Sequence, residues 1–301
     1  MLSSGEKVFM ALATVEFILG ILVNGFIVLM NCIKWVKSKK LPPSELILLS
    51  LAISQIGLLC TLVWDSYFSV ISTDVYTQVR IIDIFLLVTH TSNIWFATVL
   101  SIFYFLKITN FSNPFFLWMK RRIDRMVFRL LWGPLIICFS IGFLMVERIY
   151  YYYGSLFSRG KERNVSQEVQ VSKSMLLMFQ VLFGLLSLIP FTLSTISFSL
   201  FIVSLWRHTQ QMQLNGSGSR DTSIEAHVQA MKAVSSFLIL FLLYYVGLFM
   251  SYLSSPPEDN KLLLELGMPI MLLYPFGHSL ILILGNSKLR KTALRMSWLI
   301  R

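Results

Sequence analysis

Five consecutive polar residues, Thr89-His90-Thr91-Ser92-Asn93, interrupt an otherwise apolar stretch of the chain. On a helix, residues four apart share a face, so Leu86 lies beside His90, and Asn93 falls one turn further along. The stripe of Leu86, Leu87, His90 and Asn93 suits a small ligand of mixed polarity. The alternative is that the hydroxyl groups bond to their own helix and His90 is a buried structural donor. No second His or Cys is paired with His90, so we expect no metal site.

The sequence motifs of common enzymes and of nucleotide-binding proteins are absent from this chain. The sequence has no phosphate-binding Gly loop, no HExxH pair, no nucleophile elbow and no paired carboxylates inside an apolar run. The net charge of +11 could indicate nucleic-acid binding, but the basic residues lie between apolar segments and not on a soluble face. We therefore expect no cofactor and no nucleic acid, and nothing favours an enzyme or a transporter.

The composition places the chain in a membrane. Hydrophobic residues make up 55% and charged residues 14%, with a mean hydropathy of +0.69, whereas a soluble domain carries about 25% charged residues. A helix needs about 20 apolar residues to cross the hydrocarbon. Seven segments are long enough, which predicts an all-α, seven-helix membrane bundle in one domain (1–301). They are 8–30, 46–64, 81–106, 127–146, 175–205, 233–253 and 262–284.

The distribution of basic residues predicts the orientation. Of the 26 Lys and Arg residues, 18 lie after spans one, three and five, in the tail or, for Arg129, at the start of span four. The positive-inside rule then places the amino terminus outside and the carboxyl terminus in the cytoplasm. The sequon at Asn164 would lie outside, where it can be glycosylated, whereas those at Asn110 and Asn215 would lie inside. The tail, 286–301, is predicted to form a basic amphipathic helix on the inner leaflet, although it could also be simply solvated.

Polar and aromatic residues in other spans are further candidates. Glu16, Asn24 and Gln55 are expected to form hydrogen bonds between helices. Tyr244 and Met268 could line an adaptable apolar cavity, since Met suits promiscuous binding. The alternative for both is ordinary packing.

Several long motifs resemble the type 2 (bitter) taste receptor family. The resemblance runs from span one to the tail and weakens only in the outer loops. Its motifs are Asn24-Gly-Phe-Ile with Cys32-Ile-Lys-Trp, Leu51-Ala-Ile-Ser, Trp95-Phe-Ala-Thr, Leu100-Ser-Ile-Phe-Tyr-Phe-Leu-Lys107, Asn110-Phe-Ser-Asn-Pro-Phe-Phe-Leu-Trp118, Ser204-Leu-Trp-Arg-His208, Glu225-Ala-His227 and His278-Ser-Leu-Ile-Leu-Ile-Leu-Gly-Asn286.

One absence supports this resemblance, and one residue departs from it. The acidic-Arg-Tyr signature of rhodopsin-like receptors is absent after span three, where the chain has Phe103-Tyr-Phe-Leu-Lys107. The taste family usually has Arg after Leu-Ala-Ile-Ser, but this chain has Gln55. Losing that buried cation should change the hydrogen-bond and charge balance near Asn24 and span seven, and with it basal activity or signalling efficiency.

The resemblance implies a plasma-membrane receptor for small bitter compounds that activates a gustducin-type heterotrimeric G protein. The alternatives are a small seven-helix transporter or channel and a rhodopsin-like chemosensory receptor. Sequence does not predict the agonist or the oligomeric state. The expected ligand-binding residues are Leu86, Leu87, His90, Asn93, Phe183, Tyr244 and Met268. The expected switch and G-protein-coupling residues are Gln55, Tyr104, Lys107, His208 and His278.

Overall fold

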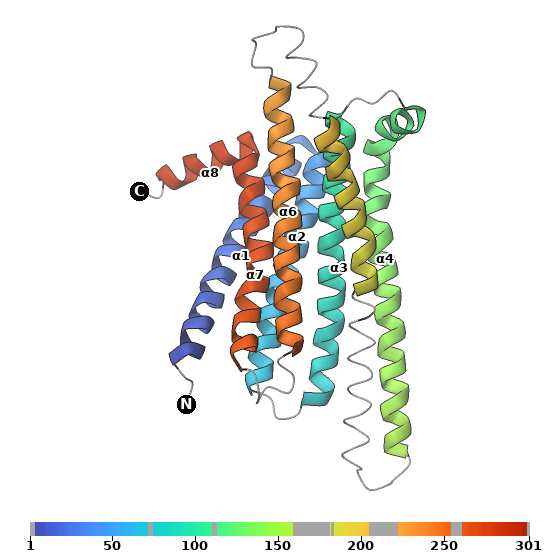
Figure 1. Ribbon diagram of the computed structural model, residues 1–301, viewed down its shortest axis with the longest axis vertical. Helices are drawn as coiled ribbons and strands as arrows, with labels where there is room; N and C mark the ends of the chain where they lie inside the picture. Colours follow the sequence, from blue (N-terminus) through green and yellow to red (C-terminus); the bar gives the residue numbers. More distant parts are fainter. Residues whose placement is uncertain are drawn as a thin grey trace.

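The computed structural model describes residues 4–71, 75–109, 113–158, 181, 184–204, 222–253 and 261–299, and these residues contain helices and no strand. Figure 1 shows the helices gathered into one elongated bundle. Their bounds are α1 Ser4–Ser38, α2 Pro43–Ile71, α3 Val75–Ile108, α4 Pro114–Ser158, α6 Thr222–Leu253, α7 Lys261–Gly285 and α8 Ser287–Leu299. A further helix at Gly184–Ser204 lies between α4 and α6 in the sequence.

Six of these helices are long and apolar enough to cross a membrane. They are α1 to α4, α7 and the helix at Gly184–Ser204, whereas the apolar part of α6, Ser235–Met250, is shorter. Large hydrophobic side chains cover the outside of the bundle: Phe143 on α4 is 71% exposed and Leu22 on α1 is 62% exposed. Exposed apolar surface on this scale needs hydrocarbon around it. The structure thus confirms an all-helical multi-pass membrane protein.

The helices extend beyond the predicted spans. α1 has 35 residues and α4 has 45, whereas hydropathy predicted spans 8–30 and 127–146. The reason is physical: hydropathy detects only the part of a helix that lies in hydrocarbon, while backbone hydrogen bonds continue the helix into water. The predicted fifth span, 175–205, lies within the described residues only from 184 to 204 and at residue 181.

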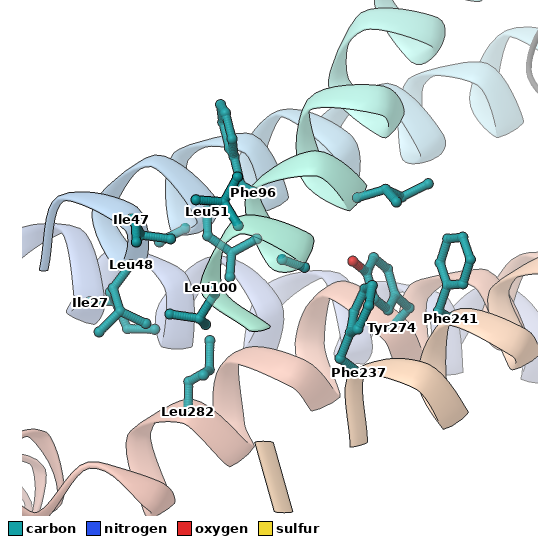
Figure 2. Close-up of a cluster of buried hydrophobic side chains, with 14 of the residues drawn as sticks. Ile27, Ile47, Leu48, Leu51, Phe96, Leu100, Phe237, Phe241, Tyr274 and Leu282 are labelled. Carbon is teal, nitrogen blue, oxygen red and sulfur yellow. The ribbon is translucent and has the colours of Figure 1, made fainter. Parts of the chain in front are cut away.

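α3 is the central helix. In the most apolar stretch of α3, 67% of the residues are buried inside the protein, compared with 22% in the most apolar stretch of α4. α4 therefore lies at the periphery. The buried side chains form one connected cluster, in which Figure 2 shows an aliphatic group around Ile27, Leu51 and Leu282 and an aromatic group around Phe237 and Tyr274. The aromatic end of this core adjoins the polar residues of α3.

α6 and α7 approach closely at Gly247. A Cβ atom added there would lie 2.7 Å from the backbone oxygen of Gly267 and 2.8 Å from a side-chain carbon of Met271. Only hydrogen fits at this contact, which is typical of small residues at helix interfaces in membranes. The contact holds the aromatic residues of α6 against α7.

α8 begins at a side-chain cap. The Asn286 Oδ1 atom accepts a hydrogen bond from the backbone N–H of Leu289, and its carbonyl oxygen accepts one from Arg290. Figure 1 shows α8 leaving the end of α7 at a steep angle and running away from the bundle. Leu289 is buried while Arg290 is exposed, as an amphipathic helix requires, and the predicted tail helix is confirmed over 287–299.

Candidate functional site

Two groups of buried polar residues occupy the interior of the bundle. The first, here called the aromatic cluster, consists of His90 and Asn93 on α3, Ser187 on the helix at Gly184–Ser204, Tyr244 on α6 and Tyr274 on α7. The second, here called the amide network, consists of Asn24 on α1, Gln55 on α2, and His278 and Ser279 on α7. All nine side chains are at most 2% exposed.

His90 is the centre of the aromatic cluster. Its Nε2 atom lies 3.1 Å from the Ser187 hydroxyl group. Its ring stacks on Tyr244, with centroids 5.0 Å apart and planes at 21°, and meets Tyr245 edge-on at 6.0 Å. His90 therefore joins three helices, α3, α6 and the helix at Gly184–Ser204, through one imidazole ring.

Asn93 lies one turn away and is only partly satisfied. Its Oδ1 atom accepts a hydrogen bond of 2.6 Å from the Tyr274 hydroxyl group. Its Nδ2 atom is buried and has no hydrogen-bond partner among the described residues. A buried amide donor without a partner costs about 1–3 kcal/mol, so this group is suited to bind an acceptor from elsewhere.

The amide network links α1, α2 and α7. Asn24 donates to the carbonyl oxygens of Gly20 (2.9 Å) and Pro275 (3.3 Å), and its Oδ1 atom accepts from Ser279 at 2.6 Å. The side chain of Gln55 lies between Ser279 and His278, with its amide 3.1 Å from His278 Nδ1. The expected interhelical hydrogen bonds are thus seen for Asn24 and Gln55. The third expected residue, Glu16, is buried, but its Oε2 atom has no partner among the described residues.

The number of hydrogens in the amide network restricts the orientation of Gln55. The Ser279 hydroxyl group contacts oxygen atoms of both Asn24 and Gln55, but it has only one hydrogen to donate. All contacts are satisfied when the Gln55 amide is flipped, because its Nε2 then donates to Ser279 and its Oε1 accepts from His278 Nδ1–H. Amide oxygen and nitrogen positions are assigned from such networks. Gln55 therefore needs His278 protonated at Nδ1.

One residue connects the two groups. The Tyr274 ring lies 5.7 Å from Tyr244 and stacks on His278 at 6.0 Å with planes at 6°. The contacts therefore run without interruption from His90 through Tyr244 and Tyr274 to His278 and the amide network.

The remaining predicted ligand-binding residues lie in different surroundings. Leu87 is fully buried, whereas Leu86 and Met268 are half-buried and pack against the core. Phe183 lies outside the described residues. Four of the seven predicted residues, His90, Asn93, Leu87 and Tyr244, are thus in the bundle interior.

The predicted coupling residues are more dispersed. Lys107 forms an exposed ion pair of 2.7 Å with Asp124, joining the end of α3 to α4. Tyr104 is half-buried and its ring lies 6.4 Å from Phe103. His278 is buried inside the bundle, away from any surface that a G protein could contact. His208 and the sequon at Asn164 lie outside the described residues.

Three hydrogen-bond partners were not predicted from the sequence: Tyr274, Ser187 and Ser279. A signal existed for Tyr274, because it precedes His278 by four residues and therefore shares its helix face. No signal in the sequence paired Ser187 with His90, which is 97 residues away.

An apolar outer surface around an interior of connected polar side chains is typical of a multi-pass helical membrane protein. The chain belongs to the taste receptor protein (TAS2R) family, which it matches over residues 1–301. It is 44% identical over 290 residues to taste receptor type 2 member 7 of Macaca mulatta, covering 95% of this chain and 91% of that protein. It is 44% identical over 301 residues to member 10 of Papio hamadryas (98% and 95% covered) and 42% identical over 303 residues to member 8 of Gorilla gorilla gorilla (98% and 97% covered).

The resemblance found in the sequence is thereby confirmed. The chain is a bitter taste receptor of the G-protein-coupled class and not an enzyme. The transporter, channel and rhodopsin-like alternatives are set aside because the family match covers every residue.

Proposed function

We propose that the aromatic cluster is the agonist site of this bitter receptor and that the amide network is the switch it controls. The observation that carries the proposal is the Nδ2 group of Asn93, which has no hydrogen-bond partner in the described part of the chain and lies close to the stacked rings of His90 and Tyr244. An agonist with an apolar body and one hydrogen-bond acceptor matches this combination. Leu86, Leu87, Phe183 and Met268 are proposed to complete the lining.

Binding requires the aromatic side chains to move. His90 and Tyr244 are stacked and fully buried, so an agonist must separate or rotate them to reach Asn93. A ligand shifts a conformational equilibrium only by binding one state more tightly than the other. In the rotated state the agonist makes the contact to Asn93. This contact is the proposed reason why the agonist binds the rotated state more tightly.

The contacts from Tyr244 through Tyr274 supply a route to the switch. Because Tyr274 bonds to Asn93 and stacks on His278, movement at the agonist site alters the packing of His278. The hydrogen bonds of His278, Gln55 and Ser279 then hold α2 and α7 in one of two arrangements. Demonstrating such a two-state element is the physical test of the route.

We further propose that the amino terminus faces outward, that the receptor resides in the plasma membrane, and that its inner end binds a gustducin-type G protein. The excess of Lys and Arg in the predicted inner loops and tail supports this orientation. In Figure 1 the basic helix α8 lies toward the end of the bundle opposite the amino terminus. Tyr104, Lys107 and His208 are the proposed coupling residues, and Asn164 the proposed glycosylation site.

The first experiment measures calcium responses in cells that express the receptor with a gustducin-type chimeric G protein, against a panel of bitter compounds. A dose-dependent response that disappears without the G protein is expected. His90→Ala should then shift agonist potency at least tenfold at equal surface expression, because the ring that faces Tyr244 is removed. The matched control is Ser92→Ala, since among the described residues the Ser92 hydroxyl group bonds within its own helix alone, to Val88. Unchanged potency for several agonists in His90→Ala would remove His90 from the site.

A further inference from the structure

A cavity of about 320 Å³ lies where α1, α2 and α8 meet, away from both polar groups described above. We propose that it binds one anionic phospholipid whose headgroup carries hydrogen-bond donors. The proposal goes beyond the agonist site and requires only that the helices lie in a membrane. The residues that carry it are Ile33, Lys34, Lys37, Glu45 and Leu289, all of which line the cavity.

The charge of the cavity favours an anion. Two lysines, Lys34 and Lys37, and one carboxylate, Glu45, contribute charge to its lining, which leaves a net charge of +1. Lys34 forms an ion pair with Glu45, between the end of α1 and the start of α2. Lys37 is exposed and has no ion-pair partner among the described residues. One phosphodiester carries one negative charge, and a contact to Lys37 would be a charge-assisted hydrogen bond.

The remaining oxygen of Glu45 favours a particular headgroup. Its Oε1 atom is engaged by Lys34, whereas its Oε2 atom is buried without a hydrogen-bond partner among the described residues. A buried acceptor of this kind is normally satisfied. A phosphodiester has no hydrogen to donate, so the donor must come from a hydroxyl or ammonium group of the headgroup. Lys37 and Glu45 together thus select a lipid that is anionic and also donates hydrogen bonds.

The apolar wall of the cavity accounts for the rest of the lipid. Met30, Ile33, Leu48 and Leu289 line it beside the charged groups, and Ile33 is 41% exposed. Lys37 stands in the last turn of α1, and the neighbouring α8 exposes Arg290 while burying Leu289. Apolar and basic side chains thus lie next to each other around the cavity. This combination is typical of the level in a bilayer at which phospholipid headgroups lie.

Native mass spectrometry of the purified full-length receptor tests the proposal with three lipids. Phosphatidylglycerol is anionic with headgroup hydroxyls, phosphatidylmethanol is anionic without a headgroup donor, and phosphatidylcholine is zwitterionic. We expect about tenfold more retained phosphatidylglycerol than phosphatidylcholine, with phosphatidylmethanol between them. Equal retention of the two anionic lipids would overturn the role of Glu45, and equal retention of all three would overturn the site.

Two variants assign the lipid to this cavity. Lys37→Ala should reduce phosphatidylglycerol to the level of phosphatidylcholine. Lys40→Ala, which removes an exposed lysine just after α1 and outside the cavity, should not. Equal losses in both would show only a diffuse basic surface and would contradict the proposal. Glu45→Gln should weaken the preference for phosphatidylglycerol over phosphatidylmethanol while keeping both above phosphatidylcholine, an outcome that misfolding does not produce. Equal thermal midpoints in phosphatidylcholine check that each variant is folded.

Discussion

The aromatic cluster and the amide network are both fully buried, but they differ in how their hydrogen-bonding groups are paired. In the amide network, Asn24 uses both of its donors and its acceptor, and Gln55 is bonded at both ends of its amide. In the aromatic cluster, neither of the two N–H donors of Asn93 Nδ2 has a partner among the described residues. A satisfied network stabilises one arrangement of helices, whereas an unsatisfied group favours binding.

The two regions also differ in their side chains. The aromatic cluster is held mainly by rings, such as the stacked pair of His90 and Tyr244, which can rotate without breaking many hydrogen bonds. The amide network is held by short polar side chains whose geometry is directional. Mutations in the aromatic cluster should therefore affect agonist potency first, and mutations in the amide network should affect stability and the extent of signalling first.

The largest effect is expected from Gln55→Leu. Leucine has a similar size, but it leaves both Ser279 and His278 without their shared partner, which should destabilise the receptor by about 2 kcal/mol. A lower thermal midpoint and reduced surface expression should follow. Ser54→Ala is the matched control because, in the part of the chain that the structure describes, the hydroxyl of this buried neighbour bonds only to Leu51 of its own helix. Equal midpoints for the two variants would refute the stabilising role of the amide network.

Asn93→Leu should have the next largest effect, chiefly on binding. It removes the Nδ2 donor, so potency should fall at least tenfold for agonists with a hydrogen-bond acceptor, or about 1.4 kcal/mol. Purely apolar agonists should change less. Dose–response curves for both kinds of agonist at matched surface expression provide the measurement. An equal loss for both kinds would mean that Asn93 acts through the fold and not through a ligand contact.

Ser279→Ala should produce a smaller loss of stability, about 1 kcal/mol, because Asn24 and Gln55 lose one shared hydroxyl group. The control is Ser101→Ala, a buried serine whose hydroxyl bonds to Ala97 in the same helix. Thermal unfolding of the two purified variants separates an interhelical bond from an intrahelical one. If Ser101→Ala is destabilised as much as Ser279→Ala, the link between α1, α2 and α7 contributes nothing measurable.

The smallest effect on potency is expected from Gln55→Arg, which introduces the residue usual in the family. A guanidinium group donates only, so it would bond to the Ser279 oxygen and to an unprotonated His278 Nδ1, reversing the tautomer that Gln55 requires. Basal or maximal calcium signalling should change, while agonist potency should stay within about threefold, or ~0.65 kcal/mol. A larger shift in potency with unchanged basal and maximal signals would contradict the separation of the two regions.

Much of this architecture could be predicted from the sequence. Hydropathy indicated the apolar segments, and the polar residues within them identified His90, Asn93, Asn24 and Gln55 as interior side chains, which burial confirms. The ends of the helices were harder to predict, because polar residues continue a helix into water without an apolar signal in the sequence. The partnership of Asn93 with Tyr274 was also missed, although Tyr274 and His278 share a helix face.

The sequence by itself determined that the chain is an all-helical membrane protein of the taste receptor family, because the composition requires hydrocarbon around the helices and the motifs are long and specific. It also identified His90, Asn93, Asn24 and Gln55 as buried polar groups, since an apolar helix has few places for them. Only the tertiary structure decided which of these groups are paired. Hydrogen bonds form at contacts of about 3 Å between helices that are distant in the sequence, as between Asn24 and Ser279. The same is true of the cavity between α1, α2 and α8, whose lining comes from three separate helices.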